Sequence, residues 1–438
     1  MVRSFVIAFL VPFSCALSAC GPAVENVPVD AGESVSLSSY TWHEDIRPIF
    51  HRSCLGCHSA EGISGIDLSS PEALVVWGDA IASAVSERRM PPWTAAKGCA
   101  DYEGDFSLSD DEIDVIVDWA LNGMPEGNES DAAVLPEPYE PPTLPRVDHV
   151  LRMPVAYQPT QAPDDYRCFL LDLPFEEDVW VTGFHVQPGN AQIAHHAIPY
   201  LIPPEDVEAF EGLDERDPLP GYRCFGGPGG TVLTLQRMRW LGAWAPGGGA
   251  QIMPEGLGLR VQAGSKVALQ MHYHVEQEQL GDPSLPADQT SVELQIETEP
   301  QGWADMQPWT EISWLLGYGM EIPAQSEGVI HEFRYPVSDQ RFSVRGAALH
   351  MHELGRDARF SVIHADGTES CVVHEDRWDF NWQRNYRLQQ PIQVGPGDEL
   401  VLRCTWDNPT DAVVKWGDGT GDEMCLAISL LSGALSAN

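Results

Sequence analysis

The spacing of apolar residues changes once along the chain, near residue 126. Before that point, "WHEDIRPIFHRS" (42–53) and "SDDEIDVIVDWALNG" (109–123) repeat apolar residues at helical spacing. Beyond it, many short alternating runs are separated by Gly and Pro, which is typical of strands. The pattern predicts a multidomain chain, with a small all-α unit over 39–126 followed by an all-β region.

The second helical stretch carries its own start and stop signals. Ser109 and Glu112 have the spacing of a capping box, and Gly123 follows the last apolar residue. We therefore expect a closing helix whose apolar face contains Ile113, Ile116, Val117 and Ala120.

The β region is predicted from four clear runs, within 178–189, 256–275, 344–354 and 357–363. In "VALQMHYHV" the two-residue period places Val267, Leu269, Met271 and Tyr273 on one face, and His272 on the other. Runs of this kind predict antiparallel sandwiches. The segment 127–148 is rich in Pro and acid, so we expect a semi-rigid spacer that leaves the helical unit without a fixed interface.

Composition narrows the possible partners. The chain has 438 residues, and 65 acidic against 25 basic residues give a net charge of −40. This charge argues against nucleic acid or an anionic membrane surface as a partner.

The N-terminus is typical of export. Arg3 precedes an apolar stretch from Phe5 to Ala16, and "LSAC" (17–20) follows. This segment resembles a bacterial lipoprotein signal, which implies that 1–20 is the signal, that Cys20 carries the lipid, and that 21–38 is a tether. The resemblance implies a lipid-anchored protein of the cell envelope that faces the periplasm or the exterior, with the outer membrane as one candidate. An ordinary secretory signal is the alternative.

The motif "CLGCH" (54–58) provides the first candidate chemistry. In a C-x-x-C-H motif, Cys54 and Cys57 form thioethers to haem and His58 is an axial iron ligand. With its flanking helices, the region resembles a class I cytochrome c, which implies one covalently bound haem c. Met90 in "RMPPW" fits the sixth ligand, because the prolines keep its loop extended. Met124 is the competitor, but it follows the closing helix and is favoured as a packing residue.

Histidines of the β region form two further candidate sites. On a strand, His350 and His352 of "ALHMHELG" share one face, so they are either half of a metal site or two surface imidazoles. Adjacent His195 and His196 cannot both reach one ion from a regular strand, so they require a bend or an irregular edge there. Three imidazoles in one set, and two imidazoles with a thioether in another, suit copper better than zinc.

The order of these motifs carries a second resemblance. The H-H pair, "LQ-x-H-Y", "H-x-H-x-L-G" and "D-E-M-C" occur in the order found in the copper type II, ascorbate-dependent monooxygenases. The resemblance covers roughly 150–436. It implies tandem jelly-roll sandwiches over 149–300 and 301–438, with two copper ions and ascorbate or another reductant as the electron donor.

The resemblance also implies roles for individual residues. His195, His196 and His272 would bind the electron-transfer copper, and His350, His352 and Met424 would bind the catalytic copper that activates O2. The first of these coppers is therefore the expected electron acceptor. The family commonly has a disulfide near its methionine ligand, which implies Cys404–Cys425. Cys168 and Cys224 bracket the His195 segment similarly and form a second candidate pair, whereas Cys99 and Cys371 have no assigned partner.

The resulting hypothesis is a copper-dependent monooxygenase that hydroxylates a C–H bond of a small organic substrate with O2. Two outside electrons are needed for each oxygen atom inserted, and the fused haem can relay them from a periplasmic redox donor. The alternative is a non-catalytic electron-transfer or copper-binding protein, and a haem that accepts electrons during substrate oxidation is a third possibility. "MCLAISLL" lacks the polar and aromatic residues of the peptide-specific branch, which disfavours a peptidylglycine substrate.

Overall fold

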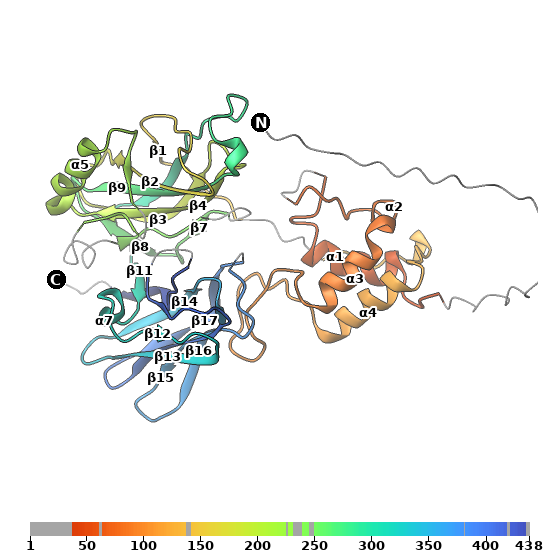
Figure 1. The fold of residues 1–438 in the computed structure, drawn as a ribbon. Coiled ribbons are helices and arrows are strands. Elements are labelled where there is room, and N and C mark those ends of the chain that lie inside the picture. Colours follow the sequence, from red (N-terminus) through yellow and green to blue (C-terminus); the bar gives the residue numbers. More distant parts are fainter. Residues whose placement is uncertain are drawn as a thin grey trace, which may run out of the picture.

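The computed structural model forms three units, one helical and two built from β-strands (Figure 1). It describes residues 37–60, 64–136, 142–224, 227–230, 239–244, 249–380, 382–417 and 421–434. The signal segment, Cys20 and most of the tether lie outside the described residues. Within these ranges, no helix is long and apolar enough to cross a membrane.

The helical unit is closed by its first and last helices. Its elements are η1 (Trp42–Ile46, a π-helical turn), α1 (Arg47–Ser53), α2 (Pro71–Leu74), η2 (Val75–Trp77), α3 (Gly78–Ser86) and α4 (Asp110–Leu121). Ser109 and Glu112 form the predicted capping box at the start of α4. Trp42, Phe50 and Trp119 form an aromatic cluster with ring centroids 5.7 to 6.3 Å apart, which joins the two ends of the unit.

The first β unit is a two-layer sandwich. One layer has the order β1-β10-β3-β8, with β7 paired to β3, and the other has the order β6-β4-β9-β2-β5. The strands are β1 (His149–Arg152), β2 (Asp164–Asp172), β3 (Val179–Gln187), β4 (Ala194–Ile202), β5 (Tyr222–Arg223), β6 (Arg239–Trp240), β7 (Gln251–Ile252), β8 (Leu257–Val261), β9 (Lys266–His274) and β10 (Ser291–Glu297). Val267, Leu269, Met271 and Tyr273 are fully buried between the layers, which confirms the predicted alternation of β9. A helix that the apolar pattern did not predict, α5 (Val207–Arg216), follows β4.

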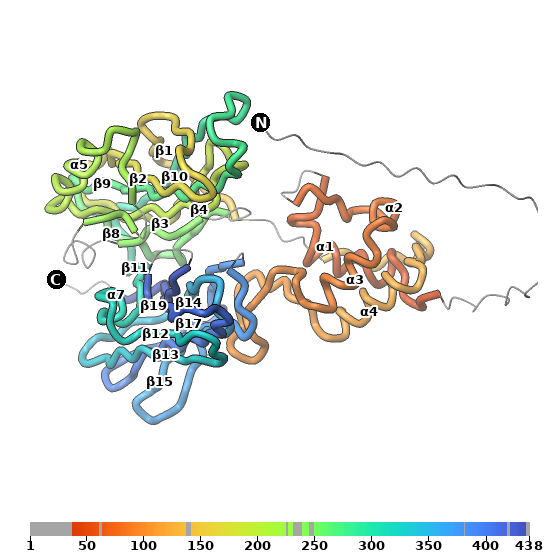
Figure 2. The backbone as a smooth tube through the Cα atoms, viewed as in Figure 1, coloured from red at the N-terminus to blue at the C-terminus, as the bar shows by residue number. Residues whose placement is uncertain are grey.

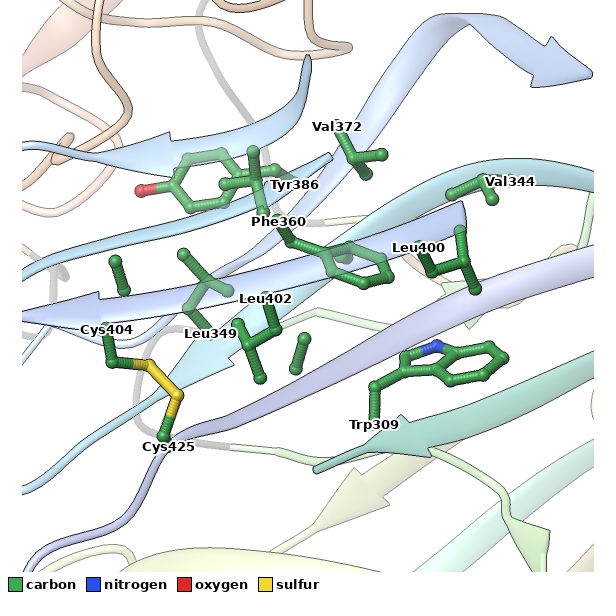
Figure 3. Packing of buried hydrophobic residues seen from close by; sticks show 14 of the residues in the cluster. Trp309, Val344, Leu349, Phe360, Val372, Tyr386, Leu400, Leu402, Cys404 and Cys425 are labelled. Atoms are coloured by element: carbon green, nitrogen blue, oxygen red, sulfur yellow. A yellow bond between two sulfur atoms is a disulfide. The ribbon is translucent and has the colours of Figure 1, made fainter. Parts of the chain in front are cut away.

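The second β unit is also a sandwich, of β11-β20-β14-β17 and β13-β18-β15-β16, with a small β12-β19 ribbon at one end. The strands are β11 (Gly302–Trp309), β12 (Glu321–Ile322), β13 (Ser326–Pro336), β14 (Phe342–His350), β15 (Gly355–Ile363), β16 (Glu369–Glu375), β17 (Asn385–Val394), β18 (Glu399–Asn408), β19 (Val414–Lys415) and β20 (Leu426–Ala434), with a short helix α7 (Ile312–Leu315) after β11. Figure 3 shows Trp309, Phe360 and Leu402 in its core beside the Cys404–Cys425 disulfide.

The two sandwiches meet through β11. Its residue Met306 pairs with Trp240 of β6, and Gly302 pairs in parallel with Leu257 of β8, so hydrogen bonds continue from one unit into the other. Each sandwich nevertheless buries its own hydrophobic cluster, one drawn from residues 151–296 and the other mainly from residues 303–431. The backbone trace of Figure 2 shows the two units stacked, with the helical unit to one side.

The loop between α3 and α4 overturns the expectation that the helical unit has no fixed interface. Trp93, Tyr102 and Phe106 of this loop are buried in the hydrophobic core of the second β unit rather than in the helical unit. Cys99 forms a disulfide with Cys371 of β16. The expectation failed because the linker composition describes only one connection, whereas this second connection joins residues 272 positions apart.

Further backbone pairing reinforces this interface. Ala95 pairs with Glu375, Tyr102 pairs with Leu388, and the amide of Ala96 donates to the carbonyl of His374 at 2.7 Å. We name residues 93–106 the docking loop. Because its ends lead back to α3 and α4, the loop holds the helical unit against β16 and β17.

Candidate metal centres

The first histidine group depends on an irregularity in β4. The pairing of β4 with β9 shifts register between Ala194 and His196, which leaves His195 in a bulge. This is the irregular edge that two adjacent histidines require. His196 lies directly opposite His272 of β9 in the resumed register, so three imidazoles meet at one place.

The three rings converge through one type of nitrogen. Nδ1 of His272 lies 3.1 Å from Nδ1 of His195 and 3.1 Å from Nδ1 of His196. All three residues offer ligand atoms within 4.8 Å of one another, which is close enough to bind a single ion. Burial lowers the pKa of His272 to about 4, so this ring is neutral and can act as a ligand at neutral pH.

Asp164 and Tyr166 of β2 support this group, and neither was identified from the sequence. Nε2 of His272 lies 2.8 Å from the Asp164 carboxylate, which also binds Nδ1 of His274 at 3.0 Å. With its Nε2 proton donated to Asp164, His272 presents the lone pair of Nδ1 to the group. Tyr166 stacks on the His272 ring at 4.1 Å and further restricts its orientation. The i, i+2 spacing of Asp164 and Tyr166 on a strand was the available signal, but nothing local linked it to β9.

The second histidine group lies where β14 ends. His350 is the last residue of the strand and pairs with Leu426 of β20. The rings of His350 and His352 lie with their centroids 5.2 Å apart. The amides of His352 and Met424 both donate to Oε2 of Glu423, at 2.8 and 3.3 Å, so the segment that carries Met424 lies beside the backbone of His352.

In this group the opposite ring nitrogens are left available. Nδ1 of His350 lies 2.6 Å from Oε1 of Gln383, and Nδ1 of His352 lies 3.0 Å from the carbonyl of Asp422. Both partners are acceptors, so each Nδ1 carries the proton and each Nε2 keeps its lone pair. Burial and the adjacent His352 lower the pKa of His350 to about 4, which keeps that ring neutral.

A buried carboxylate holds the backbone of the second group. Glu423 accepts hydrogen bonds from the amides of His352 (2.8 Å) and Leu354 (2.7 Å) and from Nε1 of Trp406 (2.9 Å). Burial raises the pKa of Glu423 in spite of these donors. The Cys404–Cys425 disulfide fixes the residue after Met424 to β18, so the methionine segment is secured on both sides.

The two groups belong to different sandwiches, the first to β4 and β9 and the second to the end of β14. Burial and the neighbouring imidazoles of its own group lower the pKa of His196, and the more distant His350 adds to the effect. The effect of His350 on His196 indicates that the two groups lie near enough for their charges to interact.

The C-x-x-C-H motif forms a tight turn after α1. The amides of Cys57 and His58 donate to the carbonyl of Cys54 at 3.1 and 2.9 Å. Both thiols are unpaired, whereas the other six described cysteines form disulfides, and burial raises the pKa of Cys54 to about 12. Nδ1 of His58 is buried with no hydrogen-bond partner among the described residues, although His43 and His51 share that feature. Two free thiols beside a buried imidazole are a donor set that fits a thioether-linked haem.

The two candidate methionines of the helical unit differ in their surroundings. Met124 packs against the helical core, with Sδ about 3.1 Å from the position of a Cβ on Gly78. This contact agrees with its interpretation as a packing residue. Met90 follows α3 and is half-buried, three residues before Trp93 of the docking loop.

The disulfides include both candidate pairs and one that was unassigned. Cys168–Cys224 links β2 to the residue after β5, and Cys404–Cys425 links β18 to the residue before β20. Cys99–Cys371 was missed. Elimination could have found it, because these were the two cysteines left after the haem motif and the two candidate pairs were assigned.

Comparison with known proteins shows that this chain is similar to copper-dependent monooxygenases. Residues 320–429 match the family model described as copper type II ascorbate-dependent monooxygenase, C-terminal domain. DBH-like monooxygenase protein 1 of Homo sapiens is 24% identical over 277 residues, which are 60% of this chain and 44% of that protein. Dopamine beta-hydroxylase of Rattus norvegicus is 27% identical over 286 residues (60% and 42%), and tyramine beta-hydroxylase of Caenorhabditis briggsae is 25% identical over 285 (60% and 44%). This chain thus spans less than half the length of these relatives.

Proposed function

We propose that this protein is a copper-dependent monooxygenase that hydroxylates a C–H bond of a small organic substrate with O2. The observation that carries the proposal is the convergence of His195, His196 and His272 through their Nδ1 atoms, together with the paired rings of His350 and His352 beside the segment that carries Met424. Similarity to copper monooxygenases over 60% of the chain supports it.

The two sets have different roles in this proposal. His195, His196 and His272 hold the copper that stores an electron. His350, His352 and Met424 would hold the second copper, and the thioether would favour its Cu(I) state, the form that reacts with O2. Bound copper would supply one-electron redox chemistry. Burial lowers the pKa of His272 and of His350 to about 4, so these two rings are neutral, and Asp164 and Gln383 orient them.

Apolar residues close in sequence to Met424 favour a small organic substrate. Leu426 and Ile428 belong to a small apolar cluster with Met253 and Met306 at the junction of the sandwiches. An apolar wall beside Met424 suits a small organic molecule. The names of two relatives, dopamine beta-hydroxylase and tyramine beta-hydroxylase, point to the same size of substrate.

The helical unit, in the same proposal, is a cytochrome c domain over 39–126. Cys54 and Cys57 attach the haem, and His58 and Met90 are its axial ligands. A haem with both axial positions occupied carries one electron and binds no substrate. It relays electrons from a periplasmic redox donor, with ascorbate or another small reductant as an alternative source.

The cellular setting is part of the proposal. Cys20 would be the first residue of the mature chain, after removal of 1–19, and would carry a lipid that holds the chain at the cell envelope, facing the periplasm or the exterior. Three disulfides in the folded chain support an oxidising compartment. The sandwiches over 149–300 and 301–438 are then the catalytic domains, and the strands β1 and β11 begin at His149 and Gly302.

The test is product formation with labelled oxygen. Purified protein loaded with copper is supplied with ascorbate, ¹⁸O2 and a panel of small amines and aromatic compounds, and products are identified by mass spectrometry. One ¹⁸O atom in a hydroxylated product is the expected result. A non-catalytic electron-transfer protein would bind haem and copper yet consume no O2 with any member of the panel.

A further inference from the structure

Residues 376–380 and 382–384, between β16 and β17, lie against the second histidine group. Gln383 binds Nδ1 of His350 at 2.6 Å, and Nε1 of Trp378 donates to the carbonyl of His352 at 2.9 Å. The ring of Phe380 lies 6.1 Å from that of His352. We name residues 376–380 and 382–384 the connecting segment.

The same segment also contacts the helical unit. The guanidinium of Arg384 lies over the rings of Phe106 and Trp93, at 4.6 and 5.5 Å from their centroids. Nη1 of Arg377 donates to the carbonyl of Arg88 at 3.1 Å, two residues before Met90. Burial raises the pKa of the Cys57 thiol, and the Arg384 charge partly offsets this, so Arg384 lies near the haem-attachment motif.

The helical unit is therefore fixed beside one histidine group in particular. Its disulfide, its β-bridges and the hydrogen bonds described above join it to residues 371–389 of the second β unit. Gln383, bound to His350, and Arg384, near Cys57, are consecutive residues. The resemblance stated above instead made the copper of the His195 set the electron acceptor.

We propose that electrons from the haem pass through the connecting segment to the copper held by His350, His352 and Met424, and not first to the copper held by the His195 set. This inference rests on the proposed function. In each transfer the haem iron goes from Fe(II) to Fe(III) and one copper goes from Cu(II) to Cu(I), with no proton moved. Two such transfers, each after renewed reduction of the haem by a periplasmic donor, would supply the two electrons of one turnover: the first electron would pass on from the copper of the His350 set to the copper of the His195 set, and the second would stay at the His350 set.

The experiment compares variants that each lack one copper. Full-length chain with haem and Cu(II) is kept without oxygen, and a laser flash with free flavin reduces the haem. Reoxidation of the haem is followed at its α-band, and freeze-quench EPR identifies the copper reduced. The fast phase should persist in His196→Ala, which lacks the first copper, and should be lost in His350→Ala. If the fast phase is lost in His196→Ala and persists in His350→Ala, the proposal is overturned. It is also overturned if the intact chain shows no fast phase of haem reoxidation.

A second pair of variants tests the connecting segment without touching a ligand. Arg384→Gln removes the cation between Phe106, Trp93 and Cys57, and Arg334→Gln, an exposed arginine of β13, is its matched control. Arg384→Gln should slow haem reoxidation about tenfold, the usual scale for groups that support a metal site, while Arg334→Gln should not. Equal rates in the two variants overturn the assigned route.

Failure of the proposed function would be recognised separately. Haem staining and copper analysis of the intact chain precede the flash experiment. A chain without covalent haem, or with fewer than two coppers, refutes the proposed function itself. A fully loaded chain that hydroxylates substrate with ascorbate but fails the flash comparison refutes only the electron route.

Discussion

The two histidine groups use the same side chain in opposite orientations. In the first group, Asp164 binds Nε2 of His272 and the Nδ1 atoms converge. In the second, Gln383 and the carbonyl of Asp422 bind the Nδ1 atoms of His350 and His352, and the Nε2 atoms remain. For His272, His350 and His352, the hydrogen-bond acceptor behind the ring decides which nitrogen is left for a metal.

The residues that support the two groups also come from different parts of the chain. The first group is built within one sandwich from adjacent strands β4, β9 and β2. The second depends on Glu423, on the Cys404–Cys425 disulfide and on a connecting segment that also binds the helical unit. We therefore expect the second group to be more sensitive to changes elsewhere in the chain.

Removal of one ligand from each group should give the largest effect. His350→Ala should release about one of the two proposed coppers and abolish hydroxylation, with the haem spectrum unchanged, because the haem motif lies in another unit. His196→Ala should release the other copper. Copper analysis and EPR measure both outcomes. His364→Ala, whose ring binds Ser370, is the control that should keep both ions. A single copper in the intact protein would contradict the two-site interpretation.

Loss of the Glu423 carboxylate should affect the second group alone. Glu423→Ala leaves the amides of His352 and Leu354 and the Trp406 indole without their acceptor, and the free energy of unfolding should fall by about 3 kcal/mol. Copper at the first group should remain. Glu423→Gln keeps one acceptor oxygen, so its free energy of unfolding should fall by less. Chemical denaturation and copper analysis provide the measurements, and an equal loss of both coppers would argue against this assignment.

The stability of the protein should depend on pH through Glu375, the buried carboxyl group that contacts the docking loop. Burial raises the pKa of Glu375 to about 8, although Thr94 of the loop donates to it at 2.6 Å. The folded state thus keeps this proton while the unfolded chain releases it above about pH 4.5, so stability should fall as the pH rises from about 4.5 to 8.

Glu375→Gln keeps an acceptor for Thr94 and removes the titration. It should be more stable than the native protein by about 1–3 kcal/mol at pH 8 and show a flatter pH profile. Thermal unfolding from pH 5 to pH 8 measures this. Parallel profiles for the two proteins would show that Glu375 does not titrate in this range.

The smallest expected effect concerns the first group. Asp164→Asn weakens the hydrogen bond that fixes the tautomer of His272, and copper affinity at this group should fall about tenfold. The second group should be unaffected. Competition titration with a Cu(I) chelator gives both affinities, and Asp172→Asn at the other end of β2 is the control. Equal affinities in the two variants would show that Asp164 does not position His272.

Local pattern was enough to predict much of this protein. Both terminal helices of the helical unit, the alternation of β9 and the need for an irregular edge at His195 follow from residues a few positions apart, and the structure confirms them. These features could be predicted because helix and strand periods are properties of the chain itself.

Only the tertiary structure placed Asp164 behind His272, Glu423 behind His352 and Gln383 behind His350. It also brought Cys99 to Cys371 and buried Trp93 in the second sandwich rather than in the helical unit. Each of these contacts joins residues that are 33 to 293 positions apart, from His350 and Gln383 to Trp93 and Tyr386. No local period encodes such contacts, because they arise only when separate elements bury their apolar faces against one another and satisfy the polar groups left at the junction.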